Sequence, residues 1–80
     1  MTEAQARQLL ADELGRIAPD IRFEKVDPGE DLRDAFDLDS IDFLNLVTAL
    51  SQRLRITIAE ADYHNLCCLD EATRYLAAKA

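Results

Sequence analysis

Ser40 is the residue of this chain whose surroundings are most suited to covalent chemistry, because it stands between Asp39 and an apolar residue and is followed closely by Asp42. A serine hydroxyl becomes a catalytic nucleophile when a histidine removes its proton, and His64 is the only histidine. The chain has only two glycines, and none is suitably placed to form an oxyanion hole. A small hydrolase with His64 as the base is therefore the least favoured role of Ser40, and two others are open: an attachment point for another group, or a simple helix cap.

The start of a helix at Asp39 or Ser40 would suit a phosphodiester on the serine oxygen. The free backbone N–H groups and the positive end of the helix dipole attract an anion. The carboxylates of Asp39 and Asp42 oppose this attraction and would turn the phosphate outward, so a long arm tethered there would swing freely. Asp39 is also a good N-cap, so the motif alone fits an ordinary helix start.

The spacing of apolar residues predicts two long amphipathic helices. The first follows a capping box at Thr2 and ends near Ala18, because Pro19 disfavours a helical residue before it. The second runs from Asp39 or Ser40 to about Leu54. Between them, residues 19–38 form a long loop, with one helical turn expected around 32–36. Its isolated apolar residues are expected to anchor it in the core: Ile21, Phe23, Val26, Leu32, Phe36 and Leu38.

The C-terminal third predicts two shorter helices after an extended connector that inserts Ile56 and Ile58 into the core. One helix is expected around 59–65, and the last from about Asp70, as its cap, to about residue 78. The sequence therefore predicts an all-α four-helix bundle with a long loop between the first and second helices and a short third helix. Residues 1–80 are expected to form a single domain.

The net charge of −7 argues against nucleic acid and anionic membranes as partners. The negative charge is concentrated just before Ser40, since residues 20–39 hold eight acidic and three basic side chains. A basic surface on a partner protein is a better match.

Cys67 and Cys68 are adjacent and are expected to be two small buried hydrophobic residues rather than a disulfide. With one histidine and no zinc-type spacing, no metal site is expected. No signal peptide and no membrane-spanning run is visible, so insertion into a membrane is not expected. These features predict a cytoplasmic protein.

From Asp39 to Leu76 the chain resembles acyl carrier proteins of bacterial fatty-acid and polyketide pathways, without a gap. Asp39-Ser40-Ile41-Asp42 is similar to the family's Asp-Ser-Leu-Asp attachment motif. The other matching features are Leu46-Val47-Thr48-Ala49-Leu50, Arg55-Ile56-Thr57-Ile58, Leu66, Leu69 and Tyr75-Leu76. Residues 1–38 agree in plan more than in sequence.

The resemblance implies that Ser40 receives 4′-phosphopantetheine from coenzyme A, through a phosphopantetheinyl transferase, and carries an acyl group as a thioester on that arm. The chain would catalyse nothing itself and would act as a monomer with acyl-loading and acyl-processing enzymes. The resemblance assigns docking to Ile41, Asp42, Leu44, Asn45, Thr48 and Ser51. It assigns an acyl pocket to Phe43, Leu46, Val47, Leu50, Leu66 and Leu76.

Several departures from the family pattern favour a specialised carrier for one dedicated pathway. Where carriers of primary fatty-acid synthesis have glutamates, this chain has Asn45, Ser51 and Gln52, so the segment 39–55 is neutral. Phe36-Asp37-Leu38 replaces the glycine usually found a few residues before the serine. Two alternatives remain: a free-standing peptidyl or aminoacyl carrier, and an unmodified acidic helical interaction module.

Overall fold

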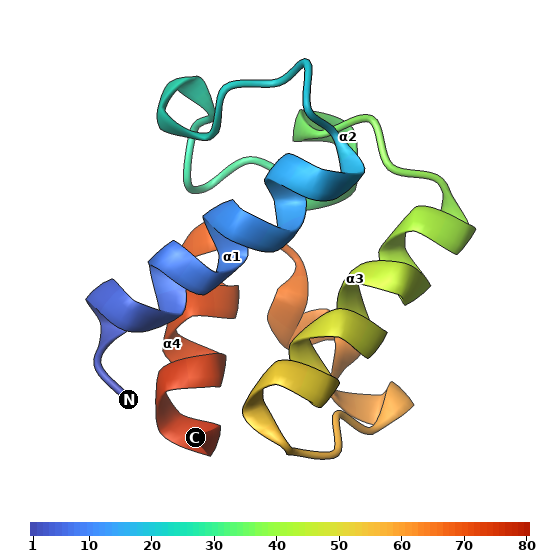
Figure 1. The fold of residues 1–80 in the computed structure, drawn as a ribbon. Coiled ribbons are helices and arrows are strands. Elements are labelled where there is room, and N and C mark those ends of the chain that lie inside the picture. The colour runs from blue at the N-terminus through green and yellow to red at the C-terminus, as the bar shows by residue number, and fades with distance from the viewer.

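The computed structural model describes residues 1–80 and consists of helices and loops without a β-strand. Four segments are α-helices and two are 3-10 helices; in chain order they are α1 (Glu3–Ile17), η1 (Phe23–Lys25), α2 (Leu32–Ala35), α3 (Ser40–Leu54), η2 (Glu60–Leu66) and α4 (Leu69–Lys79). Helix α1 packs against both α3 and α4, and the two termini lie close together (Figure 1). The predicted all-α bundle with a long loop and a short helix is confirmed.

Helix α1 begins and ends where the sequence predicts. The hydroxyl of Thr2 accepts a hydrogen bond from the backbone N–H of Gln5 at 3.1 Å, and the Gln5 side chain accepts one from the N–H of Thr2 at 2.9 Å. This capping box satisfies two N–H groups that lack a partner within the helix. The last helical residue is Ile17, shortly before Pro19. The buried side of α1 consists of Ala6, Leu9, Leu10, Glu13 and Leu14.

The long connection between α1 and α3 is anchored as predicted. Leu32, Phe36 and Leu38 are buried, and Ile21, Phe23 and Val26 pack partly buried against the same core. Two backbone hydrogen bonds tie the connection to the start of α4. The N–H of Leu32 donates to the carbonyl of Cys67 at 2.7 Å, and the N–H of Asp70 donates to the carbonyl of Pro28 at 3.1 Å. These contacts fix α2, and through it the residues that lead into α3.

Two residues adopt left-handed backbone conformations that normally favour glycine. Arg55 has φ 54° and ends α3, with its N–H donating to the carbonyl of Ser51. Asp37 has φ 53° and lies between α2 and α3, in the stretch Phe36-Asp37-Leu38. Aspartate tolerates this conformation better than most residues. The chain therefore keeps a glycine-like turn before Ser40 without a glycine.

The C-terminal third differs from the prediction in two details. The short third helix is a 3-10 helix that begins at Glu60, one residue later than expected. Asp70 does not cap the last helix, because α4 already begins at Leu69 with Cys68 at its N-cap and without a side-chain cap. Burial explains the earlier start, since Leu69 is almost fully enclosed in the core. Asp70 instead lies in the first turn of α4, where the helix dipole favours a negative charge.

A hydrogen bond between α4 and η2 is expected to make the stability of this fold sensitive to alkaline pH. The hydroxyl of Tyr75 donates to Asp62 Oδ2 at 3.0 Å. Burial, and next the bond to Asp62 and its charge, raises the pKa of Tyr75 above its ordinary value of about 10. Below about pH 10 tyrosine is protonated in both the folded and unfolded states, so this contribution to stability is fully present. It is lost as the pH rises through the folded-state pKa, because the unfolded chain releases the proton more readily.

Tyr75→Phe is therefore expected to flatten the fall in stability above about pH 10. Urea unfolding followed by circular dichroism between neutral pH and pH 11 measures this fall. Tyr63→Phe is the matched control, since it removes the other tyrosine hydroxyl of the chain, for which the structure shows no hydrogen bond. Equal pH profiles for wild type and Tyr75→Phe would contradict the assignment.

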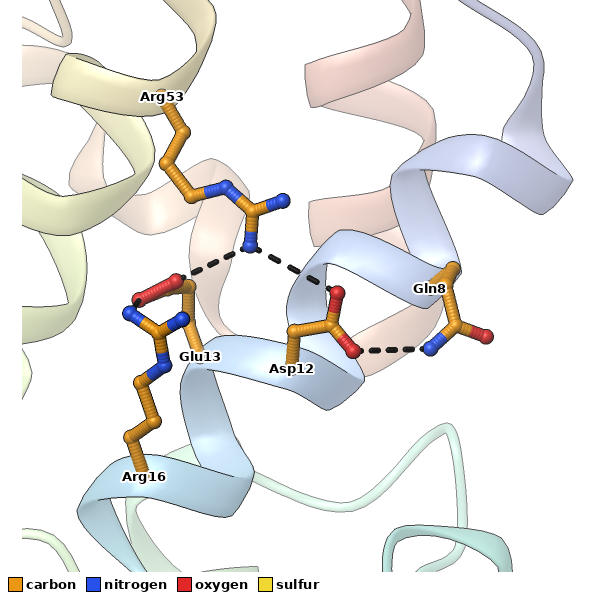
Figure 2. Close-up of polar contacts among 5 residues, drawn as sticks. All are labelled: Gln8, Asp12, Glu13, Arg16 and Arg53. Carbon is orange, nitrogen blue, oxygen red and sulfur yellow. Dashed lines mark hydrogen bonds and ion pairs between the residues drawn. The ribbon is translucent and has the colours of Figure 1, made fainter.

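A polar cluster joins α1 to α3 beside the core (Figure 2). The Nη1 atom of Arg53 lies 3.2 Å from Glu13 Oε2 and 3.6 Å from Asp12 Oδ2. Glu13 is only 4% exposed, whereas the Arg53 side chain is 43% exposed. Arg16 approaches the other oxygen of Glu13 at 3.7 Å, and Gln8 donates to Asp12 at 2.9 Å. The arginines allow the buried carboxylate to remain in a stripe that is otherwise apolar.

The hydrophobic core is continuous and includes residues from every part of the chain. As predicted, Ile58 of the connector after α3 is buried and Ile56 is partly buried against the core. No helix of the structure has the length and apolar character needed to cross a membrane.

Candidate functional site

Ser40 is the first residue of α3, and a reciprocal cap fixes the backbone around it. Asp39 is the N-cap: its Oδ1 accepts a hydrogen bond from the N–H of Asp42 at 2.7 Å. Asp42 Oδ2 accepts one from the N–H of Asp39 at 3.4 Å. The Ser40 side chain is exposed. The two predicted functions of Asp39, to start the helix and to flank the serine, are thus compatible in one geometry.

The other serine of the chain has a different environment. Ser51 lies in the last turn of α3, is half-buried, and donates its hydroxyl to the carbonyl of Val47 at 2.8 Å. Its oxygen is therefore turned back towards the helix. Ser40 makes no such bond with the backbone of its own helix. Of the two serine hydroxyls, only that of Ser40 is presented at a helix start to an approaching enzyme.

A cation contacts the Ser40 hydroxyl. The Nη2 atom of Arg33 donates a hydrogen bond to Ser40 Oγ at 3.3 Å. The central carbon of the same guanidinium group lies 5.8 Å from the centroid of the Phe43 ring. Arg33 belongs to α2, whose N-cap Asp31 accepts hydrogen bonds from the N–H groups of Arg33 and Asp34. The cap therefore sets the position of the short helix from which this arginine reaches Ser40.

A surface hollow of about 490 Å³ begins at Ser40 and lies between α3, η2 and the end of the long loop. Its lining consists of Asp31, Arg33, Ser40, Phe43, Leu44, Glu60, Tyr63, His64, Leu66 and Cys67. The rings of Phe43 and Tyr63 meet edge to face, with centroids 5.7 Å apart. The lining therefore combines apolar and aromatic side chains with the charged groups of Asp31, Arg33 and Glu60.

His64 and Cys67 line this hollow but are not arranged as a catalytic pair with Ser40. His64 Nδ1 donates to the carbonyl of Ala61 at 2.9 Å, within its own 3-10 segment, whereas Ser40 Oγ is bonded to Arg33. Cys67 is exposed, which makes the expectation of two buried cysteines wrong for this residue, while Cys68 is buried. Desolvation, and next the neighbouring Cys68 side chain, raises the pKa of the Cys67 thiol above its ordinary value, so the thiol is less reactive at neutral pH.

The residues expected to dock partners lie on the outer side of α3 and at its start. Ile41 is 69% exposed and Leu44 is 49% exposed, which is unusual for large aliphatic side chains. Asn45 and Thr48 are exposed as well, whereas Asp42 and Ser51 are half-buried. The structure therefore groups four of these six residues on one accessible face.

The residues expected to line an acyl pocket divide into two groups. Leu46, Val47, Leu50, Leu66 and Leu76 are buried in the core, and Phe43 is half-buried against it. Only Phe43 and Leu66 also line the hollow beside Ser40. In this structure the aliphatic interior is therefore closed, and the open space lies between that interior and Ser40.

Comparison with known protein families gives one match. The model described as the phosphopantetheine attachment site matches residues 4–76. The chain belongs to this family. A comparison with curated proteins gave no match. As a phosphopantetheine attachment site protein, the chain is a carrier that bears 4′-phosphopantetheine covalently, and the resemblance seen in its sequence is confirmed at this level.

The structure fits the group that phosphopantetheine attachment site proteins carry. A covalent phosphodiester requires an accessible hydroxyl, which Ser40 supplies, and a negative charge there is favoured by the free N–H groups at the start of α3 and by Arg33. Sequence reasoning missed Arg33 and Tyr63 as parts of the site. For Arg33 a signal was present, because it is the only basic residue between positions 31 and 42.

Proposed function

We propose that Ser40 bears the phosphopantetheine arm and that the chain carries acyl intermediates, as thioesters, for fatty-acid, polyketide or related specialised biosynthesis. The observation that supports Ser40 most strongly is its exposed hydroxyl at the capped start of α3, whereas the hydroxyl of Ser51 is half-buried and donates to the backbone of its own helix. The arm supplies a thiol, on which the cargo is held as a thioester.

Attachment of the arm needs only the Ser40 hydroxyl from this chain. Ser40 Oγ forms a bond to the phosphorus of coenzyme A that bears the pantetheine group, while the bond from that phosphorus to adenosine bisphosphate breaks. The hydroxyl proton passes to a base of the transferase, and adenosine bisphosphate leaves with the electron pair. Arg33 must release Ser40 Oγ, or shift to the new phosphate oxygens, for this step to occur.

The outer face of α3 is proposed to dock the transferase and then the loading and processing enzymes. Ile41 and Leu44 form an exposed apolar surface next to Ser40, with Thr48 and Asn45 beside it. Since the segment 39–55 carries two acidic and two basic residues, recognition there depends on shape and apolar contact more than on charge. This supports a dedicated set of partners, which the chain would meet as a cytoplasmic monomer.

Intact mass spectrometry of the protein, before and after incubation with coenzyme A, magnesium and a broad-specificity transferase, tests the proposal. One added phosphopantetheinyl group, located on the peptide that contains Ser40, is expected. Attachment to any other residue would refute the assignment of Ser40. Subsequent incubation with acyl-loading enzymes or with amino-acid-activating ligases then distinguishes an acyl carrier from an aminoacyl carrier, which the family assignment leaves open.

A further inference from the structure

Arg33 is the only basic residue in the most acidic part of the chain, yet it forms no ion pair. Residues 31–42 contain five aspartates and this single arginine. The ion pairs of the structure instead involve Arg16, Arg53 and Arg74. Arg33 directs its guanidinium to the neutral hydroxyl of Ser40 at 3.3 Å. The structure thus places a cation without a carboxylate partner against the Ser40 hydroxyl.

We propose that Arg33 binds the phosphodiester on Ser40 and thereby holds the start of the arm at the mouth of the hollow beside α3. The inference rests on the proposed attachment of the arm to Ser40. A guanidinium offers several N–H donors in a plane and suits the oxygens of a phosphate, so the present contact with Ser40 Oγ is replaced by stronger contacts with two anionic oxygens.

The position of Arg33 also sets the direction in which the arm leaves Ser40. Arg33 and Ser40 both line the hollow, and the guanidinium lies over Phe43, which forms part of the hollow's apolar wall. Arg33 is the only lysine or arginine of that lining. The charges of Asp39 and Asp42 alone would turn a phosphate outward into solvent. Arg33 counters this repulsion and draws the phosphate towards the hollow, so the arm begins along its wall rather than moving freely.

The mobility of the phosphodiester tests this inference without any enzyme assay. Holo-protein is prepared from wild type, Arg33→Gln and Arg33→Lys, and intact mass confirms the arm on each. The ³¹P resonance of the diester is then measured at low salt and at high salt. Because an ion pair at the surface is weakened by salt, we expect wild type and Arg33→Lys to show a broad line that narrows about twofold at high salt. Arg33→Gln is expected to show a narrow line at low salt and at high salt.

Arg7→Gln is the matched control. Arg7 is also exposed and lies over a phenylalanine, with its guanidinium carbon 5.0 Å from the centroid of Phe23, but it is not part of the hollow at Ser40. Its holo-protein is expected to behave like wild type. Two results overturn the inference and leave Ser40 attachment intact: a ³¹P line of equal width in wild type and Arg33→Gln at low salt, or a line in Arg7→Gln that is already as narrow at low salt as that of Arg33→Gln. Absence of the arm from Ser40 of the wild type overturns both.

Discussion

Ser40→Ala is expected to abolish attachment of phosphopantetheine completely, whereas Ser51→Ala is expected to accept one arm per chain as wild type does. The two variants remove the same atom from the only two serines of the chain. They differ in position, because Ser40 is exposed at the start of α3 and Ser51 donates its hydroxyl to the carbonyl of Val47. Intact mass after a reaction with coenzyme A and a transferase measures the outcome directly.

Loss of the arm from Ser40→Ala is not expected to result from misfolding of that variant. Asp39, not Ser40, supplies the side-chain cap of α3, so loss of the Ser40 hydroxyl leaves both hydrogen bonds of the capping box in place. The stability of Ser40→Ala, measured by urea unfolding, is expected to remain within about 0.5 kcal/mol of wild type. An arm found on Ser40→Ala, or missing from Ser51→Ala, would contradict the proposed site.

The fold was predictable because its main signals are local. The capping box at Thr2, the proline after α1 and the aspartate before α3 fix three helix ends through contacts within a few residues, and the structure confirms all three. The errors concern ends that depend on tertiary contacts. Asp70 has the residue type of a cap, but burial of Leu69 starts α4 one residue earlier. Sequence spacing alone does not contain that information.

The candidate site also has features that could be predicted from the sequence and features that depend on long-range contacts. The resemblance assigned Ile41 and Leu44 to docking, and the structure shows both side chains exposed on α3. The contact of Arg33 with Ser40 depends on how the loop folds back, which the hydrogen bond from Leu32 to Cys67 fixes from the far end of the chain. Cys67, whose carbonyl accepts that hydrogen bond, lines the hollow and is exposed. Contacts of this range could not be derived from local patterns.

Leu50→Ala is expected to cost about 2–5 kcal/mol of stability, because Leu50 is fully buried and its truncation leaves a cavity in the core. A domain of this size is stable by only about 4–12 kcal/mol, so the variant approaches the unfolding threshold. Leu44→Ala is the matched control: it makes the same change on the same helix, at a position that is 49% exposed. It is expected to change stability by less than about 0.5 kcal/mol. Urea unfolding followed by circular dichroism measures both.

The same variant tests whether the closed interior shelters the cargo. Leu46, Leu50, Leu66 and Leu76 fill the core in this structure, so an acyl chain enters only by displacing them or by using space that already exists. Leu50→Ala provides such space. If the core shelters the cargo, loading a saturated acyl chain onto the arm should raise the free energy of unfolding of Leu50→Ala by more than that of wild type or Leu44→Ala. If the cargo instead lies in the hollow, which Phe43, Leu44 and Tyr63 help to line, loading should stabilise wild type and Leu50→Ala equally, and Leu44→Ala less.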